Sequence, residues 1–209
     1  YVVPAGSFVA CSTNATPKLE RYWSVLDEVG NEDLSGIGED DLAERIRTTL
    51  MESVRRRLMS DRPVGMFLSG GVDSTSILAC LSTMGTTNLR SYSIGYSNQT
   101  THDKKDEFSF AKQAADTFES PHTMLRTQPD RLREFLDTCD VPPETLGEFW
   151  LWEMAEAASQ DGVPVMMHGE GADELFFGYD FHWNVLSERQ RIHGNPNIDL
   201  NDISFDSGI

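Results

Sequence analysis

The sequence predicts an α/β fold, with a doubly wound, mainly parallel sheet flanked by helices. Four short apolar runs typical of buried strands alternate with helical patterns along the chain. Two glycine-rich loops, residues 69–75 and 168–174, each follow one of these runs directly. In doubly wound sheets, ligands bind beyond the carboxyl ends of the strands, so both loops are expected at a ligand site.

The first 38 residues are expected to precede this domain. A strand, a turn and an extended segment are indicated over residues 1–24, and the acidic, glycine-containing stretch 31–38 is typical of a linker. A helix is expected from Asp40 onward, with an apolar residue at every fourth position from Leu42 to Leu58. Its basic end, residues 55–57, favours a solvent-exposed helix C-terminus over a ligand patch.

The remaining elements alternate between strands and helices up to residue 183. The expected strands span residues 64–68, 89–96, 122–126 and 163–167. The expected helices lie within residues 72–84, 108–118, 132–139 and 146–159. Trp150, Trp152 and Trp183 are expected to pack in the core, unless one near the site contacts a ligand ring. Residues 184–209 are polar and show no clear periodicity.

Charge excludes several classes of function. The chain of 209 residues carries 17 Lys and Arg against 34 Asp and Glu, a net charge of −17. A surface this acidic disfavours nucleic acids and anionic membranes. No apolar run approaches the roughly 20 residues of a membrane-spanning helix. Cys11, Cys80 and Cys139 lack paired spacing, which indicates free thiols in a reducing cytoplasm.

The first loop has the composition of a phosphate cradle. Gly70 and Gly71 allow backbone amides to approach a ligand, and the loop opens onto a helix whose free N–H groups favour anions. Ser69 and Ser74 add hydroxyl groups. Asp73 would repel phosphate unless it binds a bridging Mg²⁺. No lysine follows the glycines, so this is not a Walker motif. A tight turn with a capped helix is the alternative.

The second loop concentrates negative charge. Glu170, Asp173 and Glu174 fall within five residues on a glycine-rich turn. Carboxylates held this close together are costly without a cation, which favours a metal site. A solvated acidic surface loop is the alternative. Because both unusual loops follow predicted strands, the two together favour a functional site over two unrelated turns.

Both loops resemble known motifs. Residues 69–74, SGGVDS, resemble the PP-loop of the ATP pyrophosphatases, whose fold is adenine nucleotide alpha hydrolase-like. Residues 169–176, GEGADELF, followed by Gly178 and Tyr179, resemble the second signature of the glutamine-hydrolysing asparagine synthetase family. The pairing is more specific than either motif alone. The segment 106–122 is also similar to that family, as are residues 4–6 together with residues 21–23. The resemblance covers roughly residues 1–25 and 40–183.

The resemblance implies an ATP-dependent amide-forming ligase. In the family, aspartate attacks ATP to give β-aspartyl-AMP and pyrophosphate, and ammonia released from glutamine then displaces AMP to give asparagine. The implied cofactors are ATP and Mg²⁺, and the implied reactants are aspartate with ammonia or glutamine. A cytoplasmic location is implied, with no nucleic-acid or membrane partner, and a homodimer is compatible with it.

Carried over position by position, the resemblance assigns catalysis to Glu170, Asp73 and Asp173. Asp73 and Asp173 would hold Mg²⁺, and Glu170 would face the acyl-adenylate and the incoming amine. Residues of the first loop would bind pyrophosphate. The others would contact adenosine, and His168 and Gly169 would do so through their backbone. The implied nucleotide-binding residues are Leu68, Ser69, Gly70, Gly71, Val72, Asp73, Ser74, Ile94, His168 and Gly169.

The sequence departs from the family in four respects. His168 stands where Ser is usual, and Phe177 where Gly is usual. The glutaminase half with its N-terminal cysteine is missing, as are most of the C-terminal helices, which supply a lysine. We therefore expect a fragment. Residues 1–38 would be the tail of a glutaminase domain plus a linker, 39–183 the ATP-binding synthetase domain, and 184–209 the start of the helical region.

Three other functions are compatible with parts of the pattern. A ligase that closes a β-lactam or macrolactam would use the same adenylation motifs. A non-catalytic nucleotide-binding remnant would explain the truncation and His168, but not the intact carboxylates. A tRNA-modifying PP-loop enzyme is disfavoured by the net charge. His102, His122 and His182 lack metal-ligand spacing and are expected in loops, strand ends or the core.

Overall fold

The computed structural model describes residues 2–28, 36–86, 89–95 and 107–185. The chain divides into two compact units, Tyr1–Ile46 and Arg47–Ile209. The candidate site lies entirely in the second unit.

The first unit is built on a β-hairpin. Strands β1 (Ser7–Ser12) and β2 (Ala15–Arg21) pair antiparallel, with Ser7 opposite Arg21. Helix α1 (Val25–Glu28) follows, and α2 (Glu39–Arg57) begins in this unit. The sequence predicts a strand, a turn and an extended segment over residues 1–24. The structure adds that the extended segment is itself a strand, because its backbone groups pair with β1.

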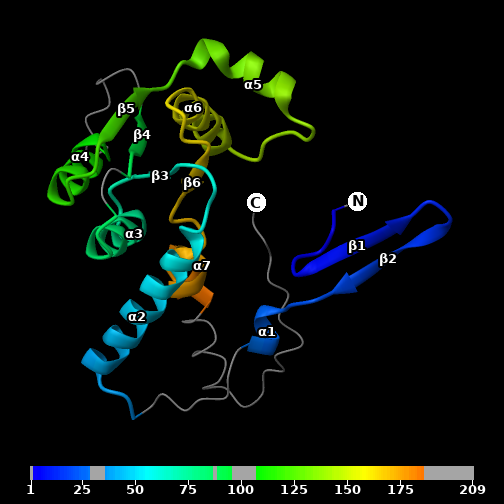
Figure 1. Ribbon diagram of the computed structural model, residues 1–209, viewed down its shortest axis with the longest axis horizontal. Helices are drawn as coiled ribbons and strands as arrows, with labels where there is room; N and C mark the ends of the chain where they lie inside the picture. Colours follow the sequence, from blue (N-terminus) through cyan, green and yellow to red (C-terminus); the bar gives the residue numbers. More distant parts are fainter. Residues whose placement is uncertain (1, 29–35, 87–88, 96–106, 186–209) are drawn as a thin grey trace. The chain divides into compact units, whose positions relative to one another are not determined.

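The second unit contains a parallel four-stranded sheet of order β5-β4-β3-β6 (Figure 1). The strand order reverses between β3 and β6, so the predicted doubly wound α/β fold is confirmed. Its elements are β3 (Val64–Phe67), α3 (Val72–Thr83), β4 (Ser91–Gly95), α4 (Glu107–Thr117), β5 (His122–Arg126), the 3-10 turn η1 (Pro129–Arg131), α5 (Leu132–Thr138), α6 (Leu146–Gln160), β6 (Val165–Met167) and α7 (Ala172–Phe176).

The four predicted strands and the predicted helices are present, with small differences at their ends. Strand β6 begins at Val165 rather than Val163, and Tyr96 of the second predicted strand lies outside the described residues. Helix α7 was not expected, because residues 168–174 were interpreted as a loop. It has only five residues, too few to show a helical period in the sequence.

Alternating side chains of the strands build a core on each face of the sheet. Met66 and Met167 pack with α3, α4 and the second half of α2. Phe67 and Met166, their neighbours in sequence, face the other way and pack with Tyr92 and α6. Figure 1 shows α3 and α4 on one side of the strands and α6 on the other. The apolar side chains of the strands are therefore buried under helices on both faces of the sheet. The ends of the strands remain available for a functional site.

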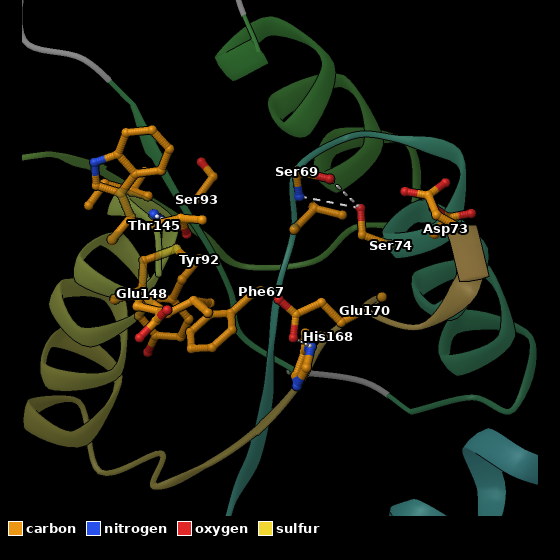
Figure 2. Close-up of a pocket in the computed structure, with 18 of the residues that line it drawn as sticks. Phe67, Ser69, Asp73, Ser74, Tyr92, Ser93, Thr145, Glu148, His168 and Glu170 are labelled. Atoms are coloured by element: carbon orange, nitrogen blue, oxygen red, sulfur yellow. Dashed lines mark hydrogen bonds and ion pairs between the residues drawn. The ribbon is translucent and has the colours of Figure 1, made fainter. Parts of the chain in front are cut away.

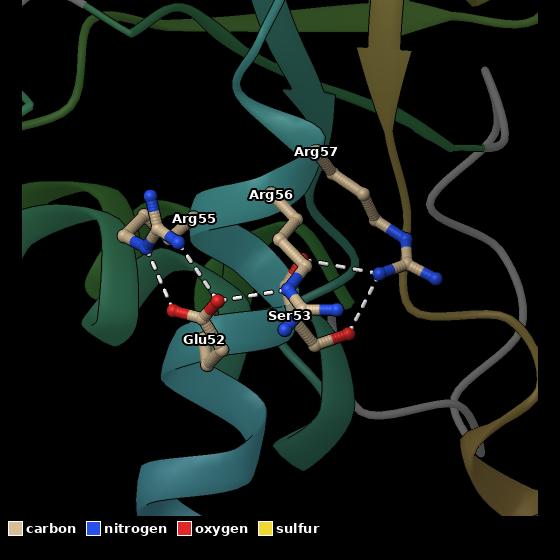
Figure 3. A network of polar contacts seen from close by, with 5 residues as sticks. All are labelled: Glu52, Ser53, Arg55, Arg56 and Arg57. Carbon is tan, nitrogen blue, oxygen red and sulfur yellow. Dashed lines mark hydrogen bonds and ion pairs between the residues drawn. The ribbon is translucent and has the colours of Figure 1, made fainter.

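The basic end of α2 contacts its own helix. Glu52 accepts hydrogen bonds from Arg55 Nε at 2.7 Å and Arg56 Nε at 2.8 Å (Figure 3). Hydrogen bonds from these two guanidinium groups lower the pKa of Glu52 to about 2. Arg57 donates to the Ser53 hydroxyl at 2.7 Å. These local contacts agree with the expected solvent-exposed helix end.

The cysteines and tryptophans meet most expectations. Cys11, Cys80 and Cys139 are free thiols. Trp152 packs against Phe135, with ring centroids 5.9 Å apart. Trp183 is 60% exposed, so the expectation that it packs in the core was wrong. Within the described part of the chain, no helix combines the length and apolar character needed to cross a membrane.

Candidate functional site

A cavity of about 530 Å³ opens where the strand order reverses (Figure 2). Strands β3 and β6 are parallel neighbours, so the loops that follow them leave the same edge of the sheet. Both loops line the cavity, as do the end of β4 and the start of α6. Its size falls in the ordinary range for small-molecule sites. The two loops singled out by the sequence therefore meet at one site.

Two serines brace the loop after β3. The Ser69 and Ser74 hydroxyls lie 3.0 Å apart, and the Ser69 amide donates to Ser74 Oγ at 3.3 Å (Figure 2). The Gly71 amide donates back to Ser69 Oγ at 3.3 Å. No described side chain caps α3 at Gly71. The loop is thus held in shape by its own serines, while the N-terminus of α3 keeps uncapped amides that suit an anion.

Gly70 shapes this loop from behind. Its φ is +81°, and a Cβ there would lie 2.7 Å from Phe110 Cβ and overlap the backbone of Ala111. Gly70 borders a second, smaller cavity of about 210 Å³ next to α4. Neither Gly71 nor Val72 lines the main cavity, and Val72 is 82% exposed. The side chains of these three predicted ligand contacts therefore do not line the main cavity, and Gly70 determines the close approach of the loop to α4.

The loop after β6 touches the first loop through Gly169. A Cβ at Gly169 would lie 3.0 Å from the Ser74 amide nitrogen and 3.2 Å from Asp73 Cβ. On either side, His168 Nδ1 lies 3.3 Å from Glu170 Oε2, and both side chains line the cavity (Figure 2). Glycine at 169 therefore lets the two loops pack together and brings Glu170 opposite the first loop.

Helix α7 adds a second pair of polar groups. The Tyr179 hydroxyl donates to Glu174 Oε1 at 2.9 Å, and this hydrogen bond raises the pKa of Tyr179. The Gly178 amide donates to the Asp173 carbonyl at 2.9 Å, and any Cβ at Gly178 would overlap the Asp173 carboxylate. The Gly178-Tyr179 part of the second signature thus holds the Glu174 carboxylate through the Tyr179 hydroxyl and leaves space for the Asp173 carboxylate beside Gly178.

The donor set suits Mg²⁺ held jointly with a phosphate. Among the described residues, no group of three or more His, Cys, Asp or Glu side chains could hold a metal alone. Mg²⁺ usually takes only one or two carboxylates and completes its shell with phosphate oxygens and water. Asp73 and Asp173, one from each loop, both line the cavity and fit that arrangement.

The charges that line the cavity also favour Mg²⁺ bound together with a phosphate. Six carboxylates line the cavity, and none of its described lining residues is Lys or Arg. The carboxylates are Asp73, Glu144, Glu148, Glu170, Asp173 and Glu174. A polyphosphate would meet strong repulsion here unless a cation accompanied it.

The α6 side of the cavity was not predicted from the sequence. Thr145 Oγ1 accepts from the Gly147 amide at 3.1 Å, and Glu148 Oε1 accepts from the Glu144 amide at 2.9 Å. The spacing of Thr145 and Glu148 is a capping-box signal that could have located this helix start. Trp150 is the tryptophan near the site that the sequence left open. Further lining residues that were not predicted are Phe67, Tyr92, Ser93, Phe108, Leu151 and Met154. They give the cavity an apolar side that faces the polar loops.

The structure brings most of the predicted site residues together. Those that line the cavity are Leu68, Ser69, Asp73, Ser74, Ile94, His168, Gly169, Glu170 and Asp173. They come from three separate strand ends.

These features define a doubly wound α/β protein whose candidate site joins a serine–glycine anion loop to a carboxylate loop at the switch point of the sheet. A family profile described as asparagine synthase matches residues 45–202. The chain belongs to the asparagine synthase family, as the resemblance of its motifs predicted.

Several curated proteins are similar to this chain. It is 30% identical to the amidase chry2 of Gibberella zeae over 90% of this chain and 30% of that protein. It is 32% identical to the glutamine-hydrolysing asparagine synthetase 2 of Bacillus subtilis over 78% of this chain and 22% of that protein. The chain therefore spans less than a third of the length of these relatives. It is also similar to the NH3-dependent NAD synthetase of Campylobacter jejuni, with 15% identity and a TM-score of 0.45 over 65% of this chain and 60% of that one.

Proposed function

We propose that this chain is the nucleotide-binding core of an ATP-dependent carbon–nitrogen ligase that activates a carboxylate as an acyl-adenylate. The meeting of the two loops in one cavity carries the proposal. Adenylation requires a polyphosphate, a carboxylate and a cation to meet, and two anions approach each other only if charge and geometry are arranged in advance. Membership of the asparagine synthase family supports this chemistry.

The nucleotide lies along the ends of β3 and β4 in this proposal. Its phosphates occupy the loop of Ser69 and Ser74 at the start of α3, where uncapped amides favour anions. Its base lies against Leu68 and Ile94 on the apolar side of the cavity. His168 and Gly169 contact it through their backbone.

The second loop faces the reacting groups. Glu170 is directed at the acyl-adenylate and at the incoming amine, beside the His168 ring. Asp73 and Asp173 are proposed to hold Mg²⁺, which would neutralise the phosphate charge. We place Glu170, Asp73 and Asp173 in the catalytic machinery.

The proposed acyl substrate is aspartate. A glutaminase domain outside this chain supplies ammonia from glutamine, and the ammonia converts β-aspartyl-AMP to asparagine. The proposed protein is cytoplasmic and acts as a homodimer. Asparagine synthetases of Bacillus subtilis at 32% identity support this assignment. A different acyl substrate is the second candidate, because the amidase chry2 matches 90% of this chain. A lactam-forming ligase belongs to this second class.

The decisive experiment measures pyrophosphate release from Mg·ATP by the purified 209-residue chain. It is run with aspartate and ammonium, with ammonium alone, and with aspartate plus hydroxylamine. Hydroxylamine traps an acyl-adenylate as a hydroxamate without a glutaminase. We expect release that depends on aspartate, together with aspartyl hydroxamate.

A second measurement makes a negative result informative. Binding of Mg·ATP is measured by calorimetry in the same buffer. Binding without release, whichever carboxylate is tested, would support a nucleotide-binding remnant over a ligase. Release driven by a carboxylate other than aspartate would favour the second candidate. Absence of both binding and release would refute the proposed function.

A further inference from the structure

His168 brings an imidazole ring into the wall of the cavity. Its side chain is 45% exposed and lines the cavity beside the Glu170 side chain (Figure 2). Among the described residues of this lining, His168 is the only Lys, Arg or His. Serine is usual at this position in the family, so the imidazole belongs to this chain and not to the shared motif. An imidazole takes up and releases protons near neutral pH, whereas a serine hydroxyl does not.

The contact with Glu170 suits a ring that accepts a proton on its far nitrogen. His168 Nδ1 lies 3.3 Å from Glu170 Oε2. A carboxylate only accepts hydrogen bonds, so this contact favours the neutral ring that carries its proton on Nδ1 and a lone pair on Nε2. A neutral imidazole has one basic nitrogen in either tautomer, so its capacity to accept a proton does not depend on this preference. The Glu170 charge compensates the positive charge of the protonated ring.

The second half of the proposed reaction releases a proton that needs an acceptor. The nitrogen of ammonia bonds to the acyl carbon, the bond from that carbon to the phosphate oxygen breaks, and AMP leaves with the electron pair. The amide keeps two of the three protons of ammonia, so the third must be taken up. Asp73 and Asp173 are proposed to hold Mg²⁺, and a hydroxyl group donates to the Glu174 carboxylate. The pair of His168 and Glu170 is the part of the second loop that remains for this proton.

We infer that His168 is a catalytic residue whose Nε2 takes the proton from the nitrogen that attacks the acyl-adenylate, and that Glu170 stabilises the protonated ring. This inference rests on the proposed function and deepens it. Imidazole is a stronger base than an exposed carboxylate, and proton transfer is most efficient to a base that titrates near the working pH. The ring then passes the proton to water and is neutral again for the next turnover.

Competition between two nucleophiles tests this step separately from adenylation. The full chain receives Mg·ATP, aspartate and a fixed mixture of ammonium and hydroxylamine, and mass spectrometry measures the amide and the hydroxamate. Both products come from the same acyl-adenylate, so their ratio does not depend on how fast the adenylate forms. After attack, the nitrogen of hydroxylamine loses a proton to water more easily than that of ammonia, because its oxygen withdraws electrons. Amide formation should therefore depend more strongly on a protein base.

Two substitutions of the ring and one control are compared. His168→Gln keeps a polar side chain but takes up no proton, and it should lower the ratio of amide to hydroxamate by at least about tenfold. His168→Ala should lower the ratio similarly, and added imidazole should restore part of the lost amide. The control is His182→Gln, at a histidine that packs against Phe181 and does not line the cavity. Its ratio should equal that of wild type, and thermal melts check that each variant folds.

The outcomes separate this inference from the proposed function. Wild type that forms neither product, with aspartate or with any carboxylate that drives pyrophosphate release, refutes the proposed function and the inference with it. Wild type that forms both products, together with a wild-type ratio in His168→Gln, refutes the inference alone. If the variant forms less of both products in an unchanged ratio, the ring acts before the amine step, and the inference is again wrong.

Discussion

The two loops of the site leave neighbouring strands but are built differently. The loop after β3 is braced by Ser69 and Ser74, presses against α4 at Gly70, and opens a helix of 12 residues. The loop after β6 opens a helix of five residues, and its Glu170 side chain is 73% exposed. The first loop is a packed frame, and the second carries exposed charge. This difference supports the proposal that the first loop holds ATP and that the second serves the acyl and amine groups.

The largest effect is expected at Asp73. This residue belongs to the packed first loop but carries a carboxylate, the group that is typical of the second loop. Asp73→Asn keeps the shape of the side chain and removes the charge that would hold Mg²⁺. We expect pyrophosphate release to fall by at least about 100-fold, and the stimulation of ATP binding by Mg²⁺ to disappear. Steady-state release and calorimetry across a magnesium titration measure both effects.

The control for Asp73 is Asp137→Asn, an exposed carboxylate on α5 that does not line the cavity. It should leave release and magnesium dependence unchanged. If Asp73→Asn bound ATP with the same affinity and the same dependence on Mg²⁺ as wild type, the metal role of Asp73 would be wrong. The packed loop would then act on phosphate through its amides alone.

A pair of alanine substitutions, one in each loop, compares the packed first loop with the exposed second loop most directly. Gly70 and Gly171 both have positive φ, +81° and +91°, so alanine is strained at either. At Gly70 a Cβ also overlaps the backbone of α4, whereas nothing lies within 4 Å at Gly171. Gly70→Ala should cost about 3 kcal/mol or more, and Gly171→Ala about 1–2 kcal/mol.

Chemical denaturation of the two variants measures this difference in the free energy of unfolding. Equal losses would show that only the backbone angle matters, and that the contact between the first loop and α4 is not tight. A larger loss for Gly171→Ala would reverse the comparison between the loops.

The framework of the site could be predicted because its signals are local. The run Val64 to Leu68 and the glycines after it lie within a dozen residues, so a strand, a turn and a helix start are evident in the sequence. The same holds for residues 163–174. The parallel alternation of strands and helices then places both loops at one edge of the sheet.

The rest of the site depends on contacts between distant residues, which a single sequence does not reveal. Thr145 and Glu148 enter the cavity only because α6 covers one face of the sheet. Ser93 is unremarkable in sequence and gains its place through the pairing of β4 with β5. Trp183 was misjudged for a related reason: its large apolar ring predicts burial, yet it lies beyond α7, where the described core has ended.

The smallest effect is expected where the two loops touch, at Gly169. A Cβ there lies 3.0 Å from the Ser74 amide and 3.2 Å from Asp73 Cβ, so Gly169→Ala should displace the start of α3 by a few tenths of an ångström. We expect ATP to bind about three- to tenfold more weakly, with little change in unfolding. Calorimetry and thermal melts measure the two quantities. The control is Gly36→Ala, a glycine off the cavity lining without a positive φ, whose Cβ would meet nothing within 4 Å. Unchanged ATP affinity in Gly169→Ala would mean that the loops move independently. In that case the two loops would differ in role without depending on their contact, and the packed first loop would not position the carboxylates of the second.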